Sequence, residues 1–437
     1  MPQGFKIAAC ASANMEKKPR PIGTRRTLLP SWLPKNALLF SIVSFLNDIS
    51  SEMIFPILPI FFTVILGAPV WALGLMEGAA HFFETMMRGA SGFYSDRQRK
   101  RRPLVIAGYG ISAFGKMAFA FASSWPICTF VRVSDRIGKG VRVTARDAIL
   151  AEDSRGPKMG EIFGIRKMAD SAGAVVGPIA TFLLLSMALS SSAEGQYRMI
   201  FLLSFIPALL GILLLFWVKE KAHKALGGSI SLQVRQMLLP KDGAWRNFLG
   251  ISAVFSLGNL SYAFLVLAAV DAHIEPAHVA LLYMLFNVVY MLFSVPAGML
   301  IDRFGSKKVI FLTFLAFAAV CAIFSLAPAA SASFGVAGAS SIIALGFAAY
   351  GLFSAAYETS TRVYVAEHFP NSRLGSALGA YNIVIGVMAL PSGLLAGLLF
   401  PLHGPYGASL AFIFGMLSSL LAAAAVLVFY KHSKHIE

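Results

Sequence analysis

The chain has 437 residues, of which 57% are hydrophobic and only 13% are charged, and its formal net charge is +16. Soluble domains have roughly 25% charged residues, and soluble cores of this total size cannot bury so much apolar surface. Three cysteines, Cys10, Cys128 and Cys321, lie too far apart for a disulfide framework or a metal cluster. The composition excludes soluble, disordered and disulfide-rich proteins and leaves an integral membrane protein with cationic loops.

Apolar segments long enough to cross a bilayer follow one another along the chain. A helix of about 20 residues spans the hydrocarbon core. The sequence predicts an all-α integral membrane protein with twelve transmembrane helices, over residues 37–65, 70–93, 103–123, 126–149, 161–188, 198–218, 247–270, 278–300, 308–328, 335–361, 374–400 and 406–430. We expect a basic tail at 1–36, two six-helix bundles at 37–218 and 247–430, a central loop at 219–246 and a carboxyl-terminal tail at 431–437.

Basic residues gather in alternate loops of this pattern. The amino-terminal tail, the loop after the second span and the central loop are rich in lysine and arginine, whereas the opposite loops offer only Arg198. Cytoplasmic loops of membrane proteins carry such an excess of cations. We therefore expect a multi-pass protein of the inner membrane with both termini in the cytoplasm. Because the charge is spread over loop ends, a nucleic-acid partner is not expected.

The two halves of the chain repeat each other. One loop motif follows both the second and the eighth span, with its members at Gly92, Asp96 and Arg97 and again at Gly298, Asp302 and Arg303. A second echo joins Ala151-Glu152 to Ala366-Glu367, after the fourth and tenth spans. Two echoes at similar offsets predict two pseudo-symmetric six-helix halves. Duplicated halves are typical of secondary transporters, whose solute site lies between them near the membrane midplane.

With these motifs, residues 37–430 resemble the major facilitator superfamily. The resemblance implies that the loop motif, at Gly92, Asp96, Arg97, Gly298, Asp302 and Arg303, gates access from the cytoplasmic side. Gly173, Gly177 and Pro178 are similar to the antiporter motif of the family's bacterial proton-coupled exporters, although Ile179-Ala180 replace the usual final glycine pair. Arg132 is similar to the family's intramembrane arginine.

Ionisable residues inside the spans are concentrated in the first half, and such residues are candidates for function. Glu77, His81, Glu84 and Arg88 share one helical face of the second span, and Arg132, Asp135, Lys139, Arg142 and Arg146 form a face of the fourth. Asp48 and Glu52 lie one turn apart on the first span. Neither face can point at lipid. The simplest arrangement pairs the acidic residues of the first two spans with the cations of the fourth.

Three interpretations of these charges remain open. They form structural ion pairs, carry a proton, or bind a solute. The candidates for proton coupling are Asp48, Glu52, Glu77, His81 and Glu84. The candidates for solute binding are Arg132, Asp135, Arg136, Lys139, Asn259, Tyr262 and Glu358. Glu77, His81 and Glu84 also have the residue types of a divalent-metal site.

The sequence therefore predicts a secondary active transporter that works by alternating access and exports a small anionic or zwitterionic organic solute in exchange for protons. The alternatives are an importer or symporter of an organic anion, a permease for a divalent metal or metal chelate, and a substrate-sensing receptor. No enzyme signature is present, and we expect no cofactor and no resident metal. The expected partners are the solute, protons and the lipid bilayer, and the expected oligomeric state is a monomer.

Overall fold

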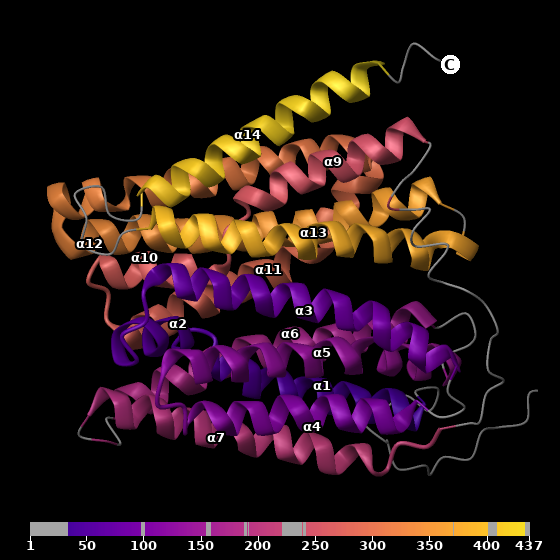
Figure 1. Ribbon diagram of the computed structural model, residues 1–437, viewed down its shortest axis with the longest axis horizontal. Coiled ribbons are helices and arrows are strands. Elements are labelled where there is room, and N and C mark those ends of the chain that lie inside the picture. Colours follow the sequence, from indigo (N-terminus) through magenta and orange to yellow (C-terminus); the bar gives the residue numbers. More distant parts are fainter. Residues whose placement is uncertain are drawn as a thin grey trace, which may run out of the picture. The chain divides into compact units, whose positions relative to one another are not determined.

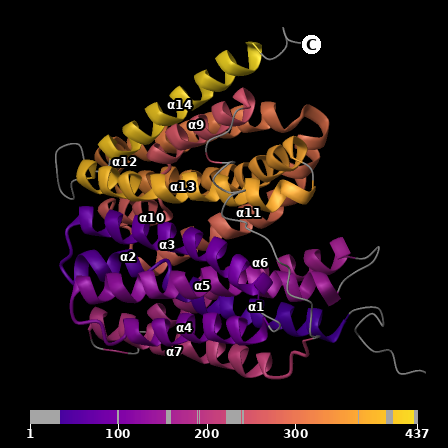
Figure 2. The same ribbon diagram turned by 45° about the vertical axis from the view of Figure 1, so that its right-hand side comes forward.

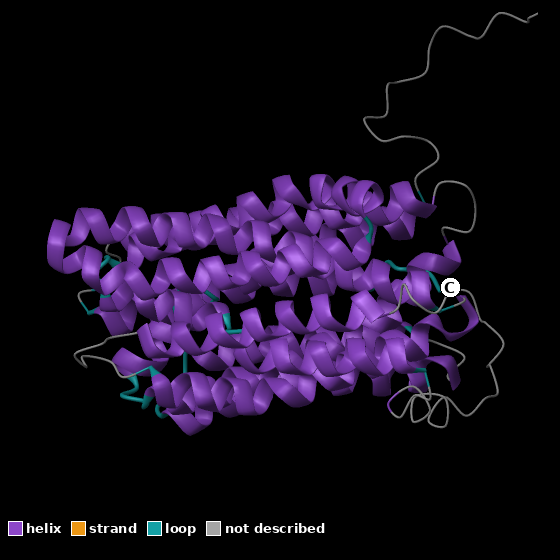
Figure 3. Cartoon of the chain, turned by 90° about the horizontal axis from the view of Figure 1, so that it is seen from above, coloured by secondary structure: helices purple, strands orange, loops and turns teal. Residues whose placement is uncertain are grey.

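The computed structural model describes residues 34–97, 101–153, 159–187, 190, 192–220, 238, 242–369, 371–400 and 409–432. These residues are helical almost throughout and include no β-strand, which confirms the predicted all-α fold (Figure 3). The first half contains α1 (Lys35–Ile54), α2 (Leu58–Ile60), a π-helical turn (Phe61–Ile65), α3 (Val70–Arg97), α4 (Arg102–Phe119), α5 (Trp125–Asp153), α6 (Met159–Ser186) and α7 (Ala193–Leu215).

The second half contains α9 (Gly243–Gly258), α10 (Tyr262–Asp271), α11 (Pro276–Phe304), α12 (Ser306–His368), α13 (Asn371–Leu399) and α14 (Ser409–His432). Inside α12 the backbone leaves the helical region at Gly335, where φ is 64°. This position accepts a left-handed φ because glycine has no Cβ. It separates the ninth and tenth predicted spans, where the small residues of the sequence blurred the boundary.

The seventh span is not the continuous helix that its apolar length predicts. The chain leaves the helix at Asn259, with ψ of 91°, and resumes as α10 after Ser261, whose side chain caps the new helix by accepting from the amide of Ala263. Serine and asparagine favour such caps over helix interiors because their side chains compete for backbone hydrogen bonds. Asn259, Ser261 and Tyr262 are the polar residues at this break. They hardly change a hydropathy average over the whole span, so the average does not reveal the break.

Nine helical segments in the described part of the chain are long and apolar enough to cross a membrane. The helices α3, α4 and α5 are not among them, because ionisable side chains lower their mean hydropathy. Together these segments match the twelve predicted spans, and the chain is a multi-pass membrane protein. Ionisable side chains of these helices are buried within the protein, among them Glu84, Lys116 and Arg132, and this keeps their charges away from lipid.

The helices α1 to α7 lie together, and α9 to α14 form a second group beside them (Figure 1, Figure 2). At the boundary α3 packs on α13, and α6 packs on α11. The α3–α13 contact brings backbone against backbone: a Cβ built on Gly393 would lie 2.1 Å from the carbonyl oxygen of Gly74. A Cβ on Gly397 would lie 2.5 Å from the Cα of Trp71. Only glycine permits this approach, which closes one end of the boundary.

The two halves also repeat a contact at the opposite ends of the helices. Arg101, at the start of α4, donates to Glu152 at the end of α5, with 2.6 Å between Nη1 and Oε1. Ser306, at the start of α12, donates to Glu367 near the end of the same helix, with 2.5 Å between Oγ and Oε2. These glutamates belong to the second sequence echo. The corresponding glutamates therefore each accept a hydrogen bond from the start of the helix that follows the loop motif.

Candidate functional site

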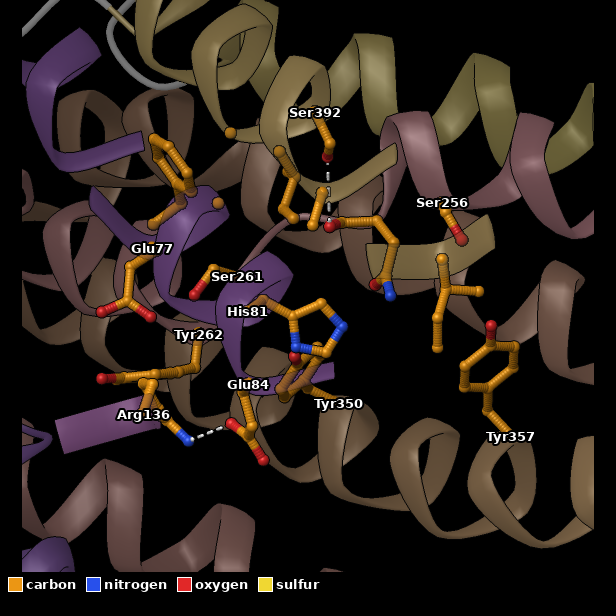
Figure 4. A pocket seen from close by; sticks show the side chains of 17 residues that line it. Glu77, His81, Glu84, Arg136, Ser256, Ser261, Tyr262, Tyr350, Tyr357 and Ser392 are labelled. Atoms are coloured by element: carbon orange, nitrogen blue, oxygen red, sulfur yellow. Dashed lines mark hydrogen bonds and ion pairs between the residues drawn. The ribbon is translucent and has the colours of Figure 1, made fainter. Parts of the chain in front are cut away.

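A cavity of about 300 Å³ lies at the boundary between the two halves. Its first wall is ionic and is formed by Glu77, His81 and Glu84 on α3 and by Arg136 on α5. Figure 4 shows these side chains on one side of the cavity, with Ser256 and Tyr357 on the other. The expected pairing between acidic residues of the second span and cations of the fourth is found here between Glu84 and Arg136.

The second wall is polar but carries no charge. The break between α9 and α10 contributes Asn259, Ser261 and Tyr262, and α12 contributes Tyr350 and Tyr357. Two candidates for solute binding predicted from the sequence, Asn259 and Tyr262, line the cavity. The sequence does not predict Tyr350 and Tyr357, because aromatic residues are too frequent in this chain for spacing to distinguish them. Their separation of two helical turns places both on one face of α12.

Arg132 holds the two halves together beside this cavity. Its guanidinium is fully buried and forms two hydrogen bonds to Glu77, at 2.9 Å from Nε to Oε1 and 3.1 Å from Nη2 to Oε2. Nη2 also donates to the hydroxyl of Tyr262 in the second half, at 2.9 Å. The guanidinium is paired with Glu77 and does not line the cavity. Glu77 is therefore compensated by Arg132, which also lies 3.8 Å from Asp135.

Glu84 has three cationic partners. Arg136 Nη1 lies 3.1 Å from Oε2, Lys139 Nζ lies 3.8 Å from Oε1, and Arg88 also donates to Oε1. Glu84 is buried, whereas Arg136 and Lys139 are half-buried. Counted over Glu84 and its direct contacts alone, three positive charges face one carboxylate, an excess of two. This excess borders the cavity through Arg136, and it attracts anions there.

Asp135 faces a different neighbour. Its carboxylate accepts a hydrogen bond from Ser112 on α4 and lies 3.8 Å from Arg132 Nη1. Lys116, also on α4, is fully buried and lies 3.3 Å from both the carbonyl oxygen and the side-chain oxygen of Asn47. Asp135 is not among the residues that line the cavity. It connects α4 and α5 behind the ionic wall.

Asp48 and Glu52 do not pair with the cations of α5, so the sequence expectation for the first span was wrong. Asp48 accepts from the side chain of Asn47 at 3.2 Å, and Glu52 accepts from Asn287 of the second half at 3.3 Å. In the described part of the chain neither carboxylate has a cation within 4 Å. Both are half-buried. Their helix face packs against α6 at Gly173 and Gly177, and Glu52 reaches Asn287 on α11.

Gly173 and Gly177 pack against the same two acidic residues. A Cβ on Gly173 would lie 2.6 Å from the carbonyl oxygen of Phe45 and 3.1 Å from the Cβ of Asp48. A Cβ on Gly177 would lie 2.7 Å from the Cβ of Glu52. Small residues at this spacing let two membrane helices approach closely. Pro178 follows inside α6. This motif therefore packs closely against another helix, and that helix is α1.

Glu358 contacts the first half through a tyrosine. Its carboxylate accepts from Tyr290 on α11, and Arg362 Nη2 lies 2.7 Å from Oε1. Lys167 on α6 donates to the same tyrosine hydroxyl at 3.2 Å. Glu358 does not line the cavity. This cluster, which sequence spacing did not identify, joins α6 to α11 and α12.

The residues of the repeated loop motif lie at the ends of α3 and α11. Gly92, Asp96 and Arg97 fall in the last turns of α3, and their side chains lie outside the described residues. Asp302 and Arg303 are exposed at the end of α11, with the Arg303 guanidinium 5.3 Å from the ring centre of Phe304. A Cβ on Gly298 would meet nothing within 4 Å. The gating role of this motif stays a prediction.

No group of three or more histidine, cysteine or carboxylate side chains in the described ranges is arranged to hold a metal ion. Glu77 and Glu84, which have metal-ligand residue types, are instead bonded to arginines. An arginine that already binds a carboxylate opposes a cation at the same oxygens. The ionic wall therefore suits an anion better than a divalent metal.

The family comparison matches nearly the whole chain. The model of the Major Facilitator Superfamily matches residues 40–270 and 247–436. An uncharacterized MFS-type transporter of Methanocaldococcus jannaschii is 33% identical over 396 residues, which cover 88% of this chain and 94% of that protein. A match of this length and identity supports a common family for both chains.

Solved structures share the fold at low sequence identity. A point mutant of the nucleoside transporter NupG aligns with a TM-score of 0.77 at 14% identity and covers 90% of this chain and 99% of that one. The D-xylose-proton symporter aligns with a TM-score of 0.67 at 18% identity, over 89% of this chain and 96% of that one. At such identities the likeness extends to the fold alone.

Proposed function

Because the chain belongs to the major facilitator superfamily, we propose that it moves a small anionic or zwitterionic organic solute across the membrane by alternating access, coupled to protons. The observation that most favours an anionic solute is the excess of positive charge around Glu84. Three cations surround this carboxylate, and one of them, Arg136, lines the cavity. Guanidinium groups bind carboxylate and phosphate through paired, charge-assisted hydrogen bonds.

The proton is assigned to Glu52, with Asp48 one turn away. Glu77 and Glu84 each contact arginine, and such contacts hold a carboxylate in its charged form. Glu52 has the neutral amide of Asn287 as its hydrogen-bond partner. That amide belongs to the second half and also donates to the carbonyl oxygen of Ala174 at 3.0 Å. A change of charge on Glu52 therefore acts directly on a contact between the halves.

Alternating access requires that the two ends of the cavity open in turn. Gly78, Ala389 and Gly393 line the cavity at the tight α3–α13 contact. If both termini are cytoplasmic, as the distribution of cations predicts, this contact closes the outer side. The repeated motif at the other end of α3 and α11 is then positioned to close the cytoplasmic side in the alternate state.

Export is the proposed direction, and it is supported by the similarity of Gly173, Gly177 and Pro178 to an antiporter motif. Symport is the second candidate, favoured by the fold likeness to a D-xylose-proton symporter. An inner-membrane location with cytoplasmic termini and a monomeric state complete the proposal. Reporter fusions at each terminus test the orientation.

The anion site is tested by Arg136→Gln. Loss of charge-assisted hydrogen bonds worth about 1.5–3 kcal/mol weakens anion binding roughly 10- to 100-fold. Equilibrium dialysis of labelled 4-hydroxybenzoate, succinate and phenylalanine against the purified chain measures this loss. Arg166→Gln is the matched control, because Arg166 pairs with Asp170 at 2.8 Å and does not line the cavity. Equal binding by both variants would contradict the proposal.

A further inference from the structure

The uncharged wall of the cavity is an aromatic surface with a rigid support. Tyr350 and Tyr357 lie half-buried on one face of α12 and line the cavity. Phe353 lies between them in the sequence, with its ring centre 5.8 Å from that of Tyr350 and 5.5 Å from that of Tyr357. The Phe353–Tyr357 rings are stacked at an angle of 23°.

Further rings and a hydroxyl fix the orientation of both tyrosines. Phe286 on α11 lies 5.2 Å from Tyr350, and Phe255 on α9 lies 5.0 Å from Tyr357, between ring centres. The hydroxyl of Tyr357 is 2.9 Å from that of Tyr381 on α13. Aromatic pairs with centres 4.5–7 Å apart attract each other beyond simple burial. Because neighbours on three helices support them, these rings are preorganised to receive a ligand.

Arg136 and an imidazole line the same cavity. His81 is exposed and lines the cavity. Within the described part of the chain, its ring forms no hydrogen bond to another residue. Figure 4 shows its ring between the ionic side, with Glu84 and Arg136, and the side of Tyr357. The cavity thus combines a cation that can bind an anion, Arg136, with the supported rings of Tyr350 and Tyr357.

We propose that the solute carries a planar aromatic or heteroaromatic ring as well as an anionic group, with Tyr350 and Tyr357 contacting the ring and Arg136, assisted by His81, binding the anion. This inference rests on the proposed function and specifies the solute class. A cavity of about 300 Å³ matches the lower end of small-molecule sites, so the solute is a compact molecule of one or two rings. Uncharged sugars lack the anion, and aliphatic acids lack the ring.

A matched pair of probes tests the aromatic contact. The compounds 4-hydroxybenzoate and trans-4-hydroxycyclohexanecarboxylate share the carboxylate, the hydroxyl and nearly the same size. We expect the purified chain to bind the aromatic probe about tenfold more tightly in isothermal titration, because favourable ring pairs add to apolar burial. Tyr350→Leu and Tyr357→Leu should reduce this ratio toward one. Tyr350→Phe and Tyr357→Phe keep the rings and should keep the ratio.

The outcomes separate this inference from the proposed function. If the two probes bind the unmodified chain with nearly equal affinity, or if the leucine variants leave the affinity ratio unchanged, the aromatic assignment is overturned. Binding of both carboxylates in that case still supports the anion site. Binding of phenol equal to that of 4-hydroxybenzoate overturns the anion site alone. Binding of neither carboxylate overturns both. Melting curves and the affinity for the aliphatic probe show whether the leucine variants are folded. A variant that keeps both but loses affinity for the aromatic probe has lost the ring contact and not the fold.

Discussion

The buried pair of Arg132 and Glu77 allows a quantitative test of the ionic wall. Arg132 is 0% exposed and Glu77 is 8% exposed, and two hydrogen bonds of 2.9 and 3.1 Å join them. Glu77→Leu leaves a buried guanidinium with Asp135 at 3.8 Å as its nearest remaining carboxylate. Breaking one side of such a pair costs about 3–5 kcal/mol of folding free energy.

The matched double variant Arg132→Met with Glu77→Leu removes both charges. An apolar replacement of similar volume is often neutral or stabilising, so the double variant should be within about 1 kcal/mol of the unmodified chain. Unfolding in mixed detergent micelles, followed by tryptophan fluorescence and evaluated as a double-mutant cycle, gives the coupling energy. If Glu77→Leu costs less than about 1 kcal/mol, or if the double variant is as unstable as the single one, the pair is not the desolvated contact described here.

Three further predictions concern the proton, the closed contact and a helix cap. Glu52→Gln should abolish proton movement in proteoliposomes while solute counterflow persists, because its contact between the halves no longer changes charge. Gly393→Ala places a Cβ 2.1 Å from a backbone oxygen of α3 and should slow counterflow at least tenfold, whereas Gly250→Ala, with open space around it, should not. Asp242→Ala removes the side-chain cap of α9 and should cost about 0.5–2 kcal/mol, and Asp242→Asn, which keeps an acceptor, should cost less.

Each prediction has a contradicting result. If the Glu52→Gln variant still moved protons, another carboxylate would have to be the proton carrier. Normal counterflow by the Gly393 variant would mean that the α3–α13 contact does not form during transport. For Asp242 the pH dependence adds a second check: the hydrogen bond from His368 lowers the pKa of Asp242 below its ordinary value of 3.8. Its stabilising contribution is therefore present above that value and is lost as pH falls below it.

Much of the fold was predictable because membrane spans obey a length rule. The apolar runs gave the helices, and the echo of Asp96 at Asp302 gave the two halves. The break at Asn259 was not predictable from hydropathy, since three polar residues hardly change an average over a whole span. The pairing of Glu77 and Glu84 with α5 followed from helical spacing, which places each set of charges on one face.

The partners of Asp48 and Glu52 could not be predicted in the same way. Spacing within a helix fixes which residues share a face, but the rotation of α1 against its neighbours depends on packing. Gly173 and Gly177 determine that packing, since they bring α6 against the acidic face of α1. The aromatic residues that line the cavity could not be predicted from the sequence either. Tyr350 and Tyr357 are two among many rings, and only the folded structure shows that they line one cavity with residues of α3.

In the proposed cycle, an anion binds at Arg136 in the cavity, and its transport is coupled to a proton carried by Glu52 at the contact between the halves. The most direct measurement follows internal pH in proteoliposomes while 4-hydroxybenzoate is supplied outside, with protein-free liposomes subtracted for passive permeation. We predict a saturable proton flux that Arg136→Gln and Glu52→Gln both abolish and that Arg166→Gln leaves intact. A flux equal to that of protein-free liposomes, or one that persists unchanged in both variants, would contradict the account.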